Sequence, residues 1–193
     1  MSSRDLVLGA LALLAAGCGN VDAPREVECG ALPVEVLPNG NFDSPAPAWV
    51  PEPGSGALIC GQPTIMPASL PSAACLGSID GTTQILTQEV PLPEGATNLT
   101  LTGQICIATA ETATLERDIL QFDLLESGSV ISSVGKRTNL DGQADCQFTA
   151  FELTSTTTSD PETAVLRLRA TLNPELPTTF YVDNLSLKVG CSN

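Results

Sequence analysis

An aspartate lies in the most strand-like stretch of the chain, near its carboxyl end. Counting back from Leu185, Leu187 and Val189, a strand of period two places Asp183 on the same face, together with Tyr181. That face packs on the core, where a carboxylate is unfavourable unless hydrogen bonds or a cation satisfy it. The spacing therefore predicts that Asp183 fastens the last strand to the start of the fold.

Residues that support catalysis are sparse. The chain has no histidine, so neither a Ser-His-Asp nor a Cys-His site can be built. The run Pro53-Gly54-Ser55-Gly56 lacks the lysine and the helix pattern of a phosphate loop. Among the 22 acidic residues, nothing positions a pair for glycoside hydrolysis. Arg167 and Arg169 either meet an anion or form a charged solvent face. We predict a protein that is not an enzyme.

The first 17 residues have the pattern of an export signal. Residues 6–16 form an apolar run that is too short to span a bilayer. The run ends in Leu14-Ala15-Ala16-Gly17-Cys18, which resembles the lipobox of bacterial lipoproteins, with Ala15 where leucine is commoner. The resemblance implies that Cys18 is lipidated and inserts its acyl chains into the bilayer. An ordinary secretory signal cut near Gly17 is the alternative. Gly19 after the cysteine favours the outer membrane of a bacterial cell envelope.

Charge narrows the choice of partners. The chain carries a formal charge of −14, which removal of residues 1–17, with Arg4 and Asp5, leaves unchanged. This charge repels nucleic acid and anionic lipid surfaces, and it favours cations or neutral partners. Residues 18–33 read as a lipidated amino terminus and short tether, and residues 34–193 as one domain with a substantial core.

Cysteine usage agrees with export. Once Cys18 is assigned to lipid, an even number of cysteines remains, which in an exported chain predicts three disulfides. Zinc is the competing use, but the chain has no C-x-x-C spacing and no histidine. The six cysteines are Cys29, Cys60, Cys75, Cys106, Cys146 and Cys191.

The domain reads as short strands broken by turns, which predicts an all-β antiparallel β-sandwich with little or no helix. One helical turn is possible within residues 108–119, and the Pro-rich residues 45–71 read as a loop. The predicted strands are residues 83–90, 98–108, 119–125, 129–134, 146–153, 164–172 and 179–189.

Four segments together resemble galactose-binding-like jelly-roll domains, a class that includes many carbohydrate-binding modules. The similarity runs in order from Pro38 to Val189, and it implies a jelly-roll sandwich without deciding function. The segments are Asn39-Gly40-Asn41-Phe42-Asp43 followed by Trp49, then Val90-Pro91-Leu92-Pro93-Glu94-Gly95-Ala96 followed by Leu99-Thr100-Leu101, then Asp118-Ile119-Leu120-Gln121-Phe122 with Ser127-Gly128, and Phe180-Tyr181-Val182-Asp183-Asn184-Leu185-Ser186-Leu187.

The resemblance also implies a metal and a packing role. A structural calcium often joins the opening segment to the closing strand in this family, so its ligands here would be Asp43 and Asp183, completed by backbone carbonyls. The alternative is that Asp43 caps a turn and Asp183 accepts backbone hydrogen bonds. Trp49 matches the family's packing position, which makes an aromatic platform for sugars doubtful in a chain with one Trp and one Tyr.

The strand order of the family implies a disulfide pairing. Cys106 and Cys146 point outward from strands that would be neighbours, where two cysteines can meet across a pair. Cys60 and Cys75 flank the Pro-rich loop. Jelly rolls of this kind bring the chain ends together, which leaves Cys29 with Cys191.

Two functional classes remain. The first is a binding module for a glycan or a protein at the cell surface. The second is a structural or adhesive envelope lipoprotein without a soluble ligand. Exposed aromatic side chains on a sheet face would favour the first, and a uniformly polar surface without a cleft would favour the second.

The lipid anchor gives the first testable prediction. We expect Cys18 to be the acylated mature amino terminus, so Cys18→Ser should release the protein from membranes or leave its precursor uncleaved. Mass spectrometry of membrane-extracted protein measures this directly. An unmodified amino terminus beyond Cys18 would contradict the lipoprotein assignment.

Overall fold

The computed structural model describes residues 32–45, 48–62, 65–77, 79–112, 114–142 and 145–191. The export signal, most of the tether, Cys18 and Cys29 lie outside these residues, so what the sequence predicts for them stays a prediction. Within the described residues, no helix has the length and apolar character needed to cross a membrane.

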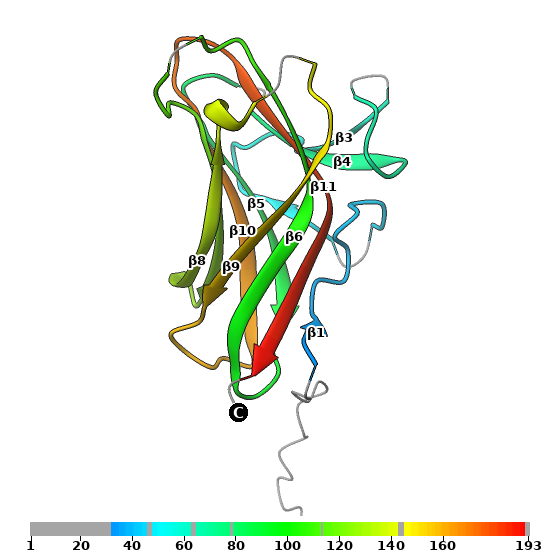
Figure 1. The fold of residues 1–193 in the computed structure, drawn as a ribbon, viewed down its shortest axis with the longest axis vertical. Helices are drawn as coiled ribbons and strands as arrows, with labels where there is room; N and C mark the ends of the chain where they lie inside the picture. The colour runs from blue at the N-terminus through cyan, green and yellow to red at the C-terminus, as the bar shows by residue number, and fades with distance from the viewer. Residues whose placement is uncertain are drawn as a thin grey trace, which may run out of the picture.

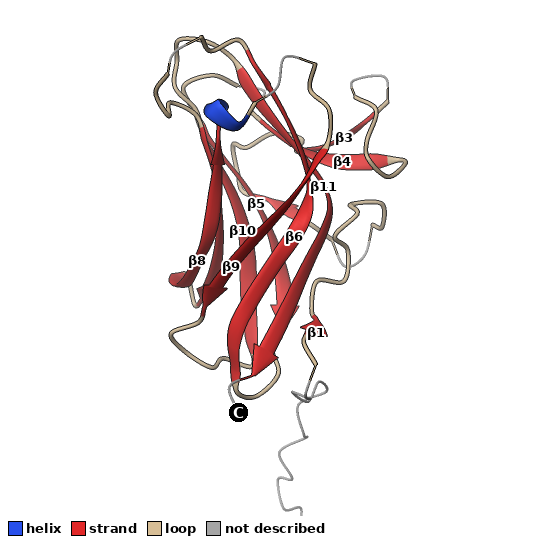
Figure 2. Ribbon diagram, viewed as in Figure 1, coloured by secondary structure: helices blue, strands red, loops and turns tan. Residues whose placement is uncertain are grey.

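Two antiparallel sheets form a β-sandwich, as the sequence predicts (Figure 1). The only helical segment of the described residues is a 3-10 turn, η1 (Asn139–Asp141) (Figure 2). The six-stranded sheet has the order β3 (Ile59–Gly61), β4 (Ser72–Leu76), β11 (Thr178–Cys191), β6 (Ala96–Thr109) and β9 (Thr149–Thr156), and β1 (Val34–Glu35) also pairs with β11. The five-stranded sheet has the order β2 (Val50–Pro51), β5 (Thr83–Pro91), β10 (Thr163–Thr171), β7 (Ile119–Glu126) and β8 (Ser129–Thr138).

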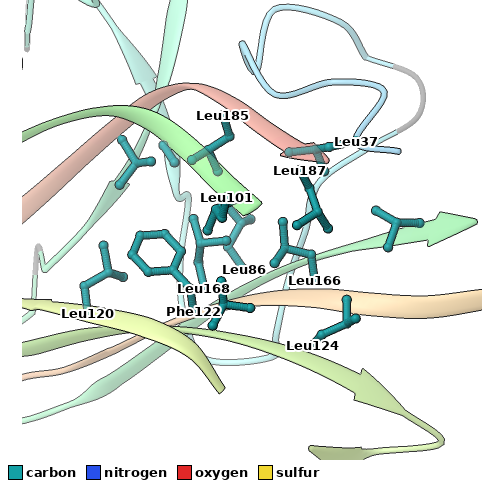
Figure 3. Packing of buried hydrophobic residues seen from close by; sticks show 14 of the residues in the cluster. Leu37, Leu86, Leu101, Leu120, Phe122, Leu124, Leu166, Leu168, Leu185 and Leu187 are labelled. Carbon is teal, nitrogen blue, oxygen red and sulfur yellow. The ribbon is translucent and has the colours of Figure 1, made fainter. Parts of the chain in front are cut away.

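Alternation of apolar and polar residues places one face of each strand in the core. In β10, Leu166 and Leu168 are buried, whereas Arg167 and Arg169 point to the outside of the sheet. The same alternation in β7 buries Phe122. These side chains meet those of the opposite sheet between the two layers (Figure 3). Each such buried leucine or phenylalanine contributes about 1.5–3 kcal/mol to folding.

The closing strand β11 departs from the predicted period. A β-bulge lies between Asp183 and Ser186, with Asn184 at a positive φ of 51°. Phe180 and Val182 face the core before the bulge, and Leu185 does so after it. The prediction that Asp183 and Tyr181 share the core face with Leu185 is therefore wrong, because the extra residue shifts the alternation by one. Asp183 is nevertheless fully buried.

The opening segment docks on this bulge. The backbone N–H of Leu185 donates to the carbonyl of Gly40 at 2.8 Å. A Cβ added to Gly40 would lie only 1.6 Å from the carbonyl oxygen of Leu185, so the approach needs a residue without a side chain. This contact explains why position 40 is a glycine.

Two predicted strand boundaries and the predicted place of the helical turn are wrong. The strand expected from residue 146 begins at Thr149, and Cys146 precedes it with a positive φ of 44°. The strand expected to end at Val134 continues to Thr138. The helical turn follows Thr138 and not residue 108, because Thr138 and Asp141 form a capping box there.

Two disulfides brace the outer face of the six-stranded sheet. Cys60 joins Cys75 across β3 and β4, with 6.0 Å between the Cα atoms, and Cys106 joins Cys146 with 5.0 Å. Both bridges agree with the predicted pairing. Tyr181 pairs in register with Cys75 on one side and Cys106 on the other, so it lies between the bridges. The third predicted pair involves Cys29, outside the described residues, and stays a prediction.

The close approach of Gly40 to Leu185 can be tested in the full chain. We expect Gly40→Ala to lower the free energy of unfolding by about 3 kcal/mol, at the upper end of the usual cost of overpacking, because the backbone must move to admit the methyl group. Urea unfolding followed by circular dichroism measures this loss.

Gly190→Ala is the matched control in β11 itself. A Cβ at Gly190 would lie 3.7 Å from that of Asn98, an ordinary contact, so we expect a change within about 0.5 kcal/mol. Equal losses for the two variants would contradict a special approach at Gly40.

Candidate functional site

Asp183 and Asp43 hold one connecting segment between them. Asp183 Oδ2 accepts the backbone N–H of Ser69 at 2.6 Å, and Oδ1 accepts that of Asn184 at 2.7 Å. The Ser69 hydroxyl donates to both oxygens at 3.1 and 3.2 Å. Asp43 Oδ1 accepts the N–H of Ser72 at 3.1 Å. We call Asp43, Asp183 and residues 69–72 the acid clamp.

The pKa of Asp183 depends on its burial and on the groups around its carboxylate. Burial raises the pKa of Asp183 above its ordinary value, and the nearby carboxylate of Asp43 raises it further. The N–H groups of Ser69 and Asn184 and the Ser69 hydroxyl act in the opposite direction. Within the described part of the chain, no basic side chain forms an ion pair with either carboxylate.

The side chains of the acid clamp can be compared with the ligands of the calcium that the family resemblance implies. Two carboxylates and a hydroxyl are oxygen ligands of the kind calcium prefers, and a cation would relieve the repulsion between Asp43 and Asp183. No group of three or more His, Cys, Asp or Glu among the described residues could hold a metal, so backbone carbonyls would have to complete the shell. The donor types fit calcium. The hydrogen bonds of the alternative, in which Asp43 and Asp183 accept backbone N–H groups, are also present.

A second polar site lies on the outer face of the five-stranded sheet. It consists of neighbouring outward side chains on β7, β8 and β10, and we call it the arginine face. Strand register places Asp123 between Ser133 and Arg167, and Gln121 between Lys136 and Arg169. The members of the arginine face are Gln121, Asp123, Ser133, Lys136, Arg167 and Arg169.

The side chains of the arginine face hold one another in place. Arg167 Nη2 donates to Asp123 Oδ2 at 2.7 Å, and Arg169 Nη2 donates to Gln121 Oε1 at 2.6 Å. Gln121 Nε2 in turn donates to Asp123 Oδ1 at 2.8 Å and to Ser133 Oγ at 3.3 Å. Asp123 thereby fixes which way the Gln121 amide points, and Gln121 fixes Arg169.

Burial on this face is uneven. Asp123 is fully buried beneath its neighbours, while the side chain of Arg167 is 17% exposed and that of Lys136 51% exposed. Breaking a buried ion pair by removing one partner costs about 3–5 kcal/mol, so Arg167 has a structural duty toward Asp123. The Nε atoms of Arg167 and Arg169 have no hydrogen-bond partner among the described residues. Arg169 differs from Arg167 in that its partner, Gln121, is neutral.

A hollow of about 290 Å³ adjoins the arginine face along the same strands. Val165, Leu125 and Glu89 continue the outward rows of β10, β7 and β5 into it, and Glu126 and Glu162 stand at its rim. The face therefore runs from a basic end at Lys136 and Arg169 to an acidic end in the hollow.

Two other hollows are less suited to a ligand. One of about 480 Å³ lies over β6, β9 and the β11 bulge, where Phe151 lines it together with polar side chains such as Gln104 and Glu152, without any basic side chain. Another, of about 340 Å³, lies beside Phe42 and Trp49 and next to residues 46–47, which are not described.

Every described aromatic side chain is buried or half-buried. Trp49 is 7% exposed, stacks on Phe42 with ring centroids 4.9 Å apart and donates its indole N–H to the carbonyl of Asn39, which confirms its packing role. Tyr181 and Phe148 are half-buried. Neither belongs to the arginine face, so a ligand there would meet polar groups and aliphatic surface.

The sequence singles out most residues of the arginine face but does not show that they lie next to one another. It places Gln121 and Asp123 opposite Phe122, and Arg167 and Arg169 opposite the core, yet their juxtaposition depends on β7 pairing with β10. The strands are separated by two others in the chain, and no short-range signal sets that pairing.

The chain was compared with known proteins. No family model matches it, and no curated protein matches its sequence. Solved structures do match. The xylan-binding module CBM15 shares 15% identity over 85% of this chain and 100% of its own, with a TM-score of 0.52. The CBM22-1 xylan-binding domain of Paenibacillus barcinonensis Xyn10C shares 6% over 86% and 99%, at 0.50.

The chain has the jelly-roll fold of carbohydrate-binding modules. The Stig cyclase Fisc of Fischerella sp. TAU also matches, with 14% identity over 84% of this chain and 100% of that one and a TM-score of 0.56. At such identities the likeness establishes the fold alone, and one fold hosts several activities. Function must therefore be argued from the residues of the two sites.

The calcium interpretation of the acid clamp gives a stability prediction. If calcium binds there, chelation should lower the melting temperature of the full chain, and calcium at about 100 times its dissociation constant should restore about 2.7 kcal/mol, or about 5–10 °C. Asp183→Asn should abolish the response, because one of the two carboxylates is lost. Differential scanning calorimetry measures both effects.

Asp118→Asn is the control for a buried aspartate that lies elsewhere. Asp118 is also fully buried and accepts the N–H of Asn173 at 2.8 Å, but it does not belong to the acid clamp. This variant should be less stable and should keep the calcium response. A wild-type melting temperature indifferent to both chelator and calcium leaves hydrogen bonding as the whole role of the clamp.

Proposed function

We propose that this protein is a non-catalytic glycan-binding module, displayed at a bacterial cell envelope and held there by lipid on Cys18. Its binding site is the arginine face with the adjoining hollow. The observation that carries the proposal is the ordered set of hydrogen-bonding side chains on a solvent-accessible sheet face of a carbohydrate-binding-module fold. An extended saccharide can lie along such a face and meet several strands at once.

The side chains of the face have complementary duties. Asp123 is too buried to meet a ligand, so it acts by orienting Arg167 and Gln121. Arg169 and Lys136 present donors to sugar oxygens. Because the donors are aligned before a ligand arrives, less side-chain freedom is lost on binding.

Aliphatic side chains supply the rest of the surface. Ile85 pairs in register with Arg169, and Val165 lies in the outward row beyond that of Arg167. They can cover the C–H faces of a sugar ring, the role that aromatic rings fill elsewhere. Burial of this apolar area contributes roughly 25 cal/mol per Å².

The tether supports display close to a membrane. The chain enters the domain at β1, beside the end of β11, so both ends of the sandwich's chain lie at the same end of the molecule (Figure 1). The stretch from Cys18 to β1 spans at most about 55 Å when fully extended. The arginine face lies along the side of the sandwich, where a glycan parallel to the long axis of the sandwich has access.

Binding to immobilised polysaccharides tests the proposal. The full chain in detergent should be retained by at least one member of a panel of neutral and uronate-containing plant and bacterial polysaccharides. Gln121→Ala should weaken retention about tenfold, because it removes an oriented acceptor and frees Arg169. Affinity electrophoresis gives the dissociation constants.

Thr102→Ala, in the hollow of the six-stranded sheet, is the matched control and should leave retention unchanged. Loss of binding in Thr102→Ala with none in Gln121→Ala would move the site to the other sheet. Failure of every polysaccharide to retain the protein would overturn glycan binding, and would leave a structural or adhesive lipoprotein.

A further inference from the structure

Positive charge is scarce in this chain and gathers on one face. The chain has eight basic residues and a formal charge of −14. Six of the basic residues are described, and three of them, Lys136, Arg167 and Arg169, belong to the arginine face. Such a concentration in an acidic protein points to a ligand that carries negative charge.

Not all of this charge is used within the protein. Asp123 pairs with Arg167, and Glu116 pairs with Lys136 at the surface. Arg169 is held only by the neutral Gln121, and its Nε is buried without a hydrogen-bond partner among the described residues. Its guanidinium is therefore an oriented cation whose charge no carboxylate among the described residues offsets in an ion pair.

The surroundings of Arg169 favour a carboxylate over neutral hydroxyls. No aromatic ring lies on the arginine face to stack a sugar, so affinity depends on polar contacts. Bonds between ions and their partners are about twice as strong as neutral ones, and the planar guanidinium matches a carboxylate with two parallel bonds. Lys136, beside Gln121 in register, lies at the same end, but Glu116 offsets its charge.

The overall charge limits how acidic the ligand can be. At −14 the protein repels a dense polyanion, and Glu89, Glu126 and Glu162 at the hollow repel a second carboxylate placed there. The face therefore suits a mostly neutral glycan with occasional acidic residues. The neutral sugars would lie toward the hollow.

We propose, resting on the glycan-binding function above, that the arginine face selects glycans with sparse uronic acid residues, whose carboxylate pairs with Arg169. Specificity would then lie in one charge-assisted contact at the basic end of the face. Asp123 and Gln121 are positioning residues for that contact.

Matched ligands test this on the wild-type protein. The probes are glucuronoxylan and sparsely acidic bacterial polysaccharides, each compared with the same polymer after chemical reduction of its carboxyl groups. We expect at least one acidic form to bind about 10- to 100-fold more tightly than its reduced form, because reduction removes the charged partner of Arg169. This preference should weaken as salt is raised, since exposed charges are screened.

Variants then assign the preference. Arg169→Gln should lower affinity for the acidic polymer to that for the reduced one, and Arg169→Lys should recover part of it. Lys188→Gln, on the other sheet, is the control for loss of one positive charge and should bind as the wild type does. Unchanged melting temperatures would show that the variants fold.

The outcomes separate this inference from the function on which it rests. Equal retention of the acidic and reduced polymers, or an acidic preference that survives Arg169→Gln, overturns the inference and leaves glycan binding in place. Tight binding of fully charged polygalacturonate, above all sparsely acidic polymers, overturns the sparse-charge requirement. Retention by no polymer overturns both.

Discussion

Asp183 is a carboxylate that the fold withdraws completely from water, and the hydrogen bonds that satisfy its two oxygens tie the closing strand to the segment before β4, not to the start of the fold as the sequence predicts. The strand that carries it, β11, pairs with β1, β4 and β6. Its partners Ser69 and Asn184 come from the segment before β4 and from the bulge itself. Without these N–H groups an uncompensated charge would remain in a region of low dielectric. The position of the connection into β4 follows from this requirement.

The same strand shows how far sequence reasoning reaches. Alternation predicted the core faces of β10 correctly, because that strand is regular and pairs in unbroken register with both neighbours. In β11 the alternation fails at the bulge, and the count from Leu185 places Asp183 on the wrong face. A period of two carries no information about where an extra residue is inserted. The prediction that Asp183 needs partners held, because burial demands them on either face.

The arginine face illustrates a different limit. The predicted alternation gives the outward side of β7 and β10, whereas Lys136 lies beyond the predicted end of its strand. The ion pair of Arg167 with Asp123 joins β10 to β7, 44 residues apart in the chain. Strand order is a property of the whole chain, set by which hydrophobic faces close the sandwich. An isolated Arg-x-Arg pattern is equally compatible with a solvated edge. The site therefore becomes visible only once the strands are paired.

The outer faces of the two sheets each carry a buried aspartate, and they satisfy its carboxylate in different ways. On the six-stranded sheet, Ser69 and Asn184 satisfy Asp183, and two disulfides flank Tyr181. That part of the surface stabilises the fold. On the five-stranded sheet, Asp123 is satisfied by side chains that themselves reach solvent. Arg167 and Gln121 thus satisfy the buried carboxylate, and in the proposed function they would also align the groups that meet a glycan, so the stability of the sheet and that alignment would rest on the same hydrogen bonds.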